Sequence, residues 1–82
     1  MIPIKFPPNQ VILRKNSKPN EVYFILKGHV LNSTSKRVFS TGSLIGETDI
    51  FYDKRDRLEE FVSLNKVFTL KLSLYYLEHI FS

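Results

Sequence analysis

Short apolar runs, separated by polar stretches that contain glycine, asparagine or proline, occupy most of the chain. The run 22–26 (VYFIL) is rich in β-forming residues and too short for a helix of its own, so it predicts a central strand buried on both faces. Further strands are predicted to begin at Val11 and to cover 29–33, 37–40, 59–64 and 67–72. Pro3, Pro7 and Pro8 make the first residues extended or edge-like. Short strands at such spacing favour a mainly β fold of the jelly-roll or double-stranded β-roll type.

Turn-forming residues lie in the connections between these strands. Asn16 suits a left-handed backbone conformation better than most residues that carry a side chain. Gly42 and Gly46 bracket a further short strand. The polar stretch 33–36 and the pair Asn65-Lys66 predict two more turns, the second of them a tight turn between the last two strands.

Two helical segments complete the predicted elements. The segment 48–52 predicts one short helical turn, with Thr48 or Asp49 near its start. Ser73 suits the N-cap of a C-terminal helix that packs onto the β-roll. The apolar positions on one face of that helix are Leu74, Leu77, Ile80 and Phe81. A chain of 82 residues predicts a single domain over 1–82 with one compact core.

The composition narrows the class of protein. Hydrophobic residues make up 43% of the chain and charged residues 24%, which is ordinary for a globular protein. The absence of cysteine excludes disulfides, thiolate zinc sites and thiol catalysis, and it fits a reducing compartment. No segment approaches the ~18 consecutive apolar residues of a membrane span, and the N-terminus lacks a signal-peptide pattern. We therefore expect a cytoplasmic protein without a membrane partner.

The net charge of +4 invites a nucleic-acid interpretation, because clustered cations gain affinity by releasing counterions from phosphates. The lysines and arginines are instead scattered among the predicted strands and turns, as on solvated strand faces. This distribution argues against a nucleic-acid partner.

The residues that could support catalysis are not arranged for it. His29 and His79 are the only histidines and lie on different elements, whereas a metal-dependent jelly-roll enzyme needs two or three that converge. Glu59 and Glu60 are adjacent on a predicted strand, so their side chains point to opposite faces. No serine stands in a G-x-S-x-G context. The sequence thus predicts no catalytic residue, no metal site and no enzyme.

One constellation does suggest a binding site. The pair Gly46-Glu47 precedes Arg57 by ten residues, and a strand-like segment follows the arginine. A carboxylate can accept hydrogen bonds from a ribose hydroxyl, and a guanidinium can hold a phosphate through two parallel charge-assisted bonds. Backbone amides near a glycine can complete an anion site. This spacing suggests a pocket for a sugar phosphate.

The same residues carry a family resemblance that extends over nearly the whole chain. The blocks that carry it are Tyr23-Phe24-Ile25-Leu26-Lys27-Gly28-His29-Val30, Thr41-Gly42-Ser43-Leu44-Ile45-Gly46-Glu47, Arg57, and Phe61-Val62-Ser63-Leu64. In this order they resemble the cyclic nucleotide-binding domain family, and the opening segment 6–22 resembles that family's first hairpin. In the family, the segment before the arginine binds the phosphate.

This resemblance implies a site for cyclic AMP or cyclic GMP, with no other cofactor. Its expected residues are Gly46, Glu47, Thr48, Arg57, Leu58 and Glu59. Glu47 would accept a hydrogen bond from the ribose 2′-hydroxyl, and Arg57 would clasp the cyclic phosphate. Leu58 stands where the family generally has a small or hydroxyl residue, and the missing hydroxyl favours cyclic AMP over cyclic GMP. The implied function is a regulatory module that captures a cyclic nucleotide and signals to a partner through its terminal helix.

Other interpretations of these residues remain open. Glu59 stands where the family generally has alanine, and it brings a carboxylate close to the expected anion, where like charges repel. The second hypothesis is therefore a degenerate domain that no longer binds nucleotide and serves protein interaction or homo-oligomerisation through its C-terminal helix. For Glu47 the structural alternative is a surface carboxylate or an internal partner of Arg57. For Arg57 it is a solvated arginine in the mixed-charge loop 53–57.

Overall fold

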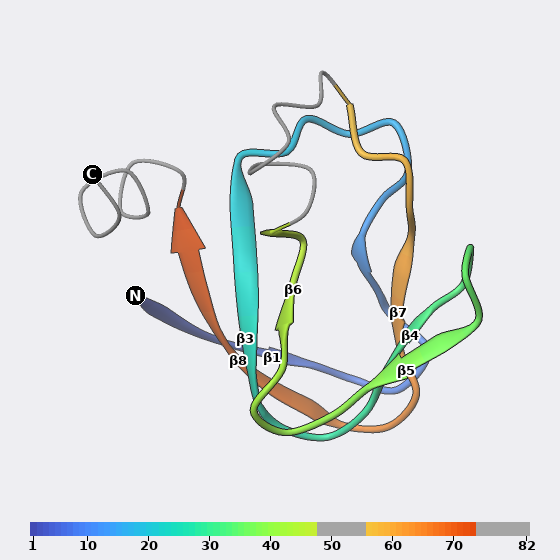
Figure 1. Ribbon diagram of the computed structural model, residues 1–82. Coiled ribbons are helices and arrows are strands. Elements are labelled where there is room, and N and C mark those ends of the chain that lie inside the picture. Colours follow the sequence, from blue (N-terminus) through green and yellow to red (C-terminus); the bar gives the residue numbers. More distant parts are fainter. Residues whose placement is uncertain (48–55, 74–82) are drawn as a thin grey trace.

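The computed structural model describes residues 1–47 and 56–73, which form two four-stranded antiparallel sheets (Figure 1). The strand order in the first sheet is β1 (Ile2–Phe6), β8 (Val67–Ser73), β3 (Glu21–Lys27) and β6 (Leu44–Ile45). The order in the second sheet is β2 (Val11–Leu13), β7 (Phe61–Ser63), β4 (Val30–Asn32) and β5 (Arg37–Phe39). The predicted mainly β, jelly-roll-like architecture is confirmed for these residues.

The hydrophobic core lies between the two sheets, because both sheets contribute its side chains. Its buried members are Phe6, Ile12, Leu13, Tyr23, Ile25, Val30, Ile45, Phe61 and Val67. Phe6 and Tyr23 meet edge to face with ring centroids 5.5 Å apart, and Phe39 packs at 5.8 Å from Phe61. Full burial of each large apolar side chain contributes ~1.5–3 kcal/mol, so this shared interior holds the sheets together.

The strand predicted for 22–26 is β3, and it lies between β8 and β6 in the first sheet. Tyr23 and Ile25 face the core, while Val22, on the opposite face, is also fully buried. Burial on both faces is thus confirmed at the start of the run, whereas Phe24, on the same face as Val22, is half-buried. Leu26 departs from this burial and is 43% exposed, at the place where the pairing with β8 shifts register between Ile25 and Lys27.

Two expected hairpins are wrong. The segment 6–22 does not form a hairpin, because β2 pairs with β7 whereas β3 pairs with β8 and β6. The pair Asn65-Lys66 does not join two partners either, because β7 and β8 belong to different sheets. Both edges of β7 are already bonded to β2 and β4, so no backbone groups are left there for β8. The short loop therefore carries the chain from one sheet to the other.

The remaining turn predictions agree with the structure. Asn16 has a positive φ of 69°, as its side chain permits. The stretch 33–36 connects β4 to β5, which pair in the register Val30↔Phe39 and Leu31↔Val38. Gly46 follows β6 directly with a φ of 89°, a conformation that favours glycine.

Both predicted helices lie outside the described residues. The segment 48–52 and the positions after Ser73 belong to this group, and Ser73 itself is the last residue of β8. In the described ranges, no helix has the length and apolar character needed to cross a membrane.

Candidate ligand-binding site

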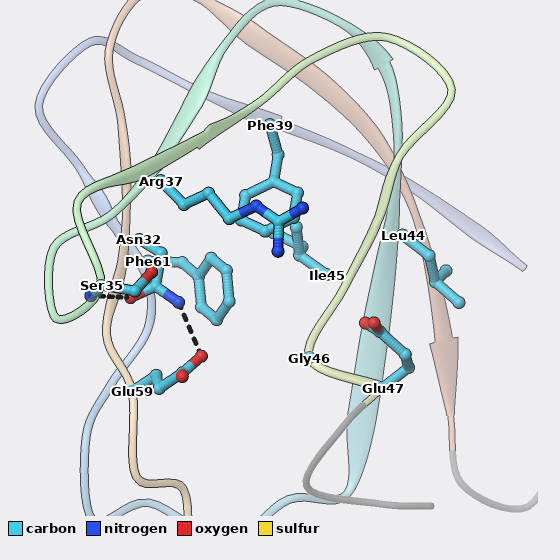
Figure 2. Close-up of a pocket in the computed structure, with 10 residues that line it drawn as sticks. All are labelled: Asn32, Ser35, Arg37, Phe39, Leu44, Ile45, Gly46, Glu47, Glu59 and Phe61. Carbon is cyan, nitrogen blue, oxygen red and sulfur yellow. Dashed lines mark hydrogen bonds between the residues drawn. The ribbon is translucent and has the colours of Figure 1, made fainter.

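A cavity of about 230 Å³ lies between the end of β6 and the strands β4, β5 and β7 (Figure 2). We call it the inter-sheet cavity. Its lining residues are Asn32, Ser35, Arg37, Phe39, Leu44, Ile45, Gly46, Glu47, Glu59 and Phe61. The segment 44–47 comes from the first sheet and the other residues from the second sheet or the loops beside it, so the cavity forms where the two sheets face each other.

Gly46 and Glu47 form the wall of the cavity on the side of the first sheet. A Cβ atom on Gly46 would lie 2.8 Å from Leu13 Cδ1 and 2.9 Å from Arg57 Nη1, so the close packing here requires glycine. Glu47 follows directly and is half-buried. Figure 2 shows its carboxylate across the cavity from Glu59. The glycine therefore positions an acidic side chain on the wall, at a site where it can accept hydrogen bonds.

Glu59 lines the opposite wall and is held by Asn32. The Asn32 Nδ2 donates to Glu59 Oε2 at 2.6 Å, and Asn32 is only 3% exposed. The Asn32 Oδ1 in turn accepts hydrogen bonds from the backbone N–H groups of Thr34 at 3.0 Å and Ser35 at 3.1 Å. One buried amide thus fixes both the Glu59 carboxylate and the turn that leads into β5.

Arg57 is 1% exposed and is directed at backbone carbonyls. Its Nη1 donates to the Gly46 carbonyl at 3.1 Å, and its Nη2 donates to the Glu21 carbonyl. Its backbone N–H donates to the Ser17 carbonyl at 2.8 Å, and its own carbonyl accepts from the Asn16 N–H at 2.7 Å. Arg57 therefore joins the turn before β3, the start of β3 and the end of β6. Among the described residues, it is not part of the lining of the inter-sheet cavity.

The structure thus brings together only some of the predicted site residues. Gly46, Glu47 and Glu59 meet at the inter-sheet cavity. Leu58 is 54% exposed and does not line it. Thr48 lies outside the described residues. The expectation of a solvated Arg57 is wrong, because its guanidinium is buried.

Arg37 lines the cavity, although sequence reasoning did not single it out. Its guanidinium carbon lies 5.6 Å from the centroid of the Phe39 ring, and Figure 2 shows the side chain extending from β5 into the cavity. Residues two apart on a strand share a face. Because Phe39 is an apolar residue that packs inward, strand periodicity could have placed Arg37 on the same inward face.

A polar network lies beneath Arg57 on the first sheet. The Tyr23 hydroxyl donates to Glu21 Oε1 at 3.2 Å, and Lys71 Nζ lies 3.2 Å from Glu21 Oε2. Burial, together with the charge and the hydrogen bond of Glu21, raises the pKa of Tyr23 to about 12, while the charge of Arg57 opposes the shift. The hydroxyl is therefore neutral at physiological pH and serves as a donor to the carboxylate.

The inter-sheet cavity offers chemistry for recognition. Carboxylate oxygens can accept from hydroxyl groups, a guanidinium can donate to an anion, and phenylalanine faces suit a planar ring. Over the ranges 1–47 and 56–73, no group of three or more His, Cys, Asp or Glu side chains is placed to hold a metal ion.

Solved structures of similar fold cover nearly all of the chain. The c-di-GMP responsive global regulator CLP of Xanthomonas campestris matches 98% of it with a TM-score of 0.83 and 17% identity. The regulatory subunit of a cAMP-independent protein kinase A from Trypanosoma brucei matches 95% with a TM-score of 0.85 and 23% identity. A PKAR CBD2 structure with bound Sp-2Cl-cAMPS matches 94%, with a TM-score of 0.85 and 12% identity. The chain spans 42%, 30% and 54% of those three chains respectively.

Sequence comparison assigns the family directly. No curated protein matches the sequence. The family model for the cyclic nucleotide-binding domain matches residues 3–82, which include the Gly46-Glu47 pair on the cavity wall. The chain therefore belongs to the cyclic nucleotide-binding domain family.

Proposed function

We propose that this chain is a regulatory module that binds a cyclic nucleotide in the inter-sheet cavity, with cyclic AMP preferred over cyclic GMP, and signals to a partner. The observation that carries the proposal is the position of Glu47. In a member of the cyclic nucleotide-binding family, the acidic residue of the Gly-Glu pair lies on the wall of a cavity between the two sheets. A regulatory role fits this family, whose members bind a messenger and leave chemistry to other domains.

In this proposal Glu47 accepts a hydrogen bond from the ribose 2′-hydroxyl. A hydrogen bond to a charged acceptor contributes about 1.5–3 kcal/mol, which corresponds to roughly tenfold to a hundredfold in affinity. The half-buried position of Glu47 supports this role, because partial removal from water strengthens the bond. The aromatic side chains of Phe39 and Phe61 on the facing strands supply apolar surface for the ligand's ring.

The preference for cyclic AMP rests on Leu58. This residue has no hydroxyl with which to favour a guanine base, and its side chain is more than half exposed. The signal to a partner, or to a second copy of the chain, would pass through the predicted C-terminal helix, which lies outside the described residues.

Calorimetric titration with cyclic AMP and cyclic GMP tests the proposal. Cyclic di-GMP belongs in the same series, because one protein of similar fold is named as responsive to it. Glu47→Gln keeps the shape of the side chain and removes its charge, and we expect it to raise the Kd for cyclic AMP by about tenfold or more. Glu60→Gln is the matched control, because Glu60 bonds to Ser33 away from the cavity, and its Kd should equal that of the wild type.

Thermal unfolding gives an independent readout of the same binding. A ligand that binds only the folded state stabilises it by RT ln(1 + [L]/Kd), or about 2.7 kcal/mol at a hundredfold excess over Kd. We expect a rise in Tm with cyclic AMP and a smaller rise with cyclic GMP. Absence of any shift at millimolar concentrations of both nucleotides would contradict the proposal.

A second candidate function follows from the acidic side of the cavity. Glu59 lines it together with Glu47, whereas Arg57 is engaged with backbone carbonyls. This arrangement supports a domain that binds no nucleotide and acts in protein interaction or homo-oligomerisation. Negative titrations together with a dimer in sedimentation equilibrium would favour this second function, and a monomer that binds cyclic AMP would exclude it.

A further inference from the structure

We infer that Arg37, on β5, is the residue that binds the negatively charged group of the ligand in the inter-sheet cavity. This inference rests on the proposed function and assigns the anion contact to Arg37 on β5, whereas the family motif indicates Arg57, in the loop before β7. The first observation is the position of Arg37 relative to the cavity. Arg37 lines the cavity, and its side chain extends into it from β5 (Figure 2).

The second observation is that Arg37 is the one cation among the described residues that line the cavity, where Glu47 and Glu59 supply two carboxylates. An anion placed between two carboxylates is repelled unless a positive charge lies close to it. The described lining carries two carboxylates and one guanidinium, so removal of Arg37 would take away the one charge there that attracts an anion. Among the described residues, Arg37 is therefore the side chain placed to attract an anionic ligand in this cavity.

The third observation is that the Arg37 guanidinium makes no hydrogen bond or ion pair with any other described residue. Its contact is the face of Phe39, 5.6 Å from the guanidinium carbon to the ring centroid. Stacking of this kind orients a guanidinium while its N–H groups stay available to a ligand. The fork geometry of these donors matches the two exocyclic oxygens of a phosphate diester.

The fourth observation explains why Glu59 does not neutralise Arg37. The Glu59 carboxylate accepts from the buried Asn32 amide at 2.6 Å, and that amide also fixes the backbone of the turn before β5. Asn32 thus holds the carboxylate at the second sheet and positions the strand that carries Arg37. By contrast, Arg57 donates through both Nη atoms to carbonyl groups on the first-sheet side of the fold.

The test is a calorimetric comparison of cyclic AMP and adenosine, which shares the base and ribose but has no phosphate. We expect Arg37→Gln to raise the Kd for cyclic AMP by about tenfold to a hundredfold and to leave the Kd for adenosine unchanged. Lys36→Gln is the matched control, since it removes the same charge one residue away and outside the cavity lining, and it should bind like the wild type. Thermal unfolding of each free protein checks that the exposed substitutions leave the fold intact.

The outcomes separate this inference from the function on which it rests. If the wild type binds cyclic AMP and Arg37→Gln binds it equally well, the Arg37 assignment is overturned and the proposed function stands. If Arg37→Gln weakens cyclic AMP and adenosine by the same factor, Arg37 contacts the nucleoside and the anion assignment is likewise overturned. If the wild type binds no cyclic nucleotide, the proposed function fails and this inference fails with it.

Discussion

Two arginines, Arg57 and Arg37, have opposite surroundings. Arg57 is 1% exposed and gives both Nη atoms to backbone carbonyls, whereas Arg37 lines the inter-sheet cavity with an aromatic ring as its contact. Arg57 occupies the motif position and Arg37 occupies no motif. The hydrogen-bond partners that the fold supplies therefore determine the role of each guanidinium.

The two arginines differ because their neighbouring strands, β6 and β5, differ in how their backbone groups are paired. β6 is only two residues long and ends at Ile45, so the carbonyl of the next residue, Gly46, lies beyond the pairing of β6 with β3. Buried carbonyls must be bonded, and the Arg57 side chain supplies the donor. The backbone groups of β5, in contrast, pair with β4. The Arg37 side chain is therefore not needed as a donor to them and can line the cavity.

Arg57→Ala should have the largest effect on stability. It removes a fully buried side chain and leaves the Gly46 and Glu21 carbonyls without this donor, at about 1–3 kcal/mol for each unsatisfied group. We expect the free energy of unfolding to fall by about 3–5 kcal/mol, measured in urea. Arg37→Ala, on the exposed guanidinium, should change it by less than about 0.5 kcal/mol. Equal losses for the two variants would contradict the contrast.

Gly46→Ala should come next, because it places a methyl group against the Arg57 guanidinium. The new Cβ would lie 2.9 Å from Arg57 Nη1 and 2.8 Å from Leu13 Cδ1, at a backbone φ of +89°. We expect a loss of about 2–4 kcal/mol from overpacking and backbone strain together.

Gly42→Ala separates the two causes. Gly42 has a nearly equal φ of +90°, but a Cβ there meets no atom within 4 Å. Its loss should be about 1–2 kcal/mol, from the backbone alone. Urea unfolding of both variants gives the difference, and a Gly42→Ala loss as large as that of Gly46→Ala would show that packing against Arg57 contributes nothing.

Asn32→Ala tests the support of the cavity wall that carries Arg37. It removes the donor to Glu59 and the acceptor for two backbone N–H groups in the turn. We expect a loss of about 2 kcal/mol in unfolding free energy, and a higher Kd for cyclic AMP because Glu59 is then released toward Arg37. Ser35→Ala is the control, as the turn uses its backbone N–H, and it should stay within about 0.5 kcal/mol of the wild type. If Asn32→Ala has the same free energy of unfolding as the wild type, Asn32 does not stabilise this wall of the cavity.

Among the variants expected to lose stability, Tyr23→Phe should have the smallest effect at neutral pH, about 1 kcal/mol from the lost hydrogen bond to Glu21. Its pH dependence is more informative. The folded pKa of Tyr23, about 12, exceeds the ordinary value of 10.0, so its contribution to stability is complete below pH 10 and is lost as pH rises to 12.

The stability difference between the wild type and Tyr23→Phe should therefore shrink over this range. Urea unfolding of both proteins at a series of alkaline pH values measures it, because groups common to the two proteins cancel. A difference that stays constant from pH 10 to 12 would show that Tyr23 is not buried against Glu21.

The strands could be predicted from the sequence because apolar periodicity and β-forming residues determine them locally. The assignment of strands to sheets could not, since the short loop between β7 and β8 is compatible with a hairpin and with a crossing between sheets. β7 lies in the second sheet because its residues pair with β2 and β4, which are distant in sequence. The local sequence pattern does not indicate which distant strands will pair.

The candidate site could be predicted in part. The Gly46-Glu47 pair on the wall was visible as a motif, because its chemistry depends on adjacent residues. Asn32 was not, because a single polar residue in a strand resembles a surface position until Glu59, 27 residues away, is brought against it. The partners of Arg57 were hidden for the same reason, since Glu21 lies 36 residues away.

The most direct test of the two arginine roles is the spectrum of their side-chain Nε–H groups in ¹⁵N-labelled protein, recorded without and with saturating cyclic AMP. Arg37→Gln assigns one signal by its disappearance, and Arg57→Lys assigns the other. We expect the Arg37 signal to shift on addition of cyclic AMP and the Arg57 signal to keep its position. A shift of the Arg57 signal with an unmoved Arg37 signal would contradict it.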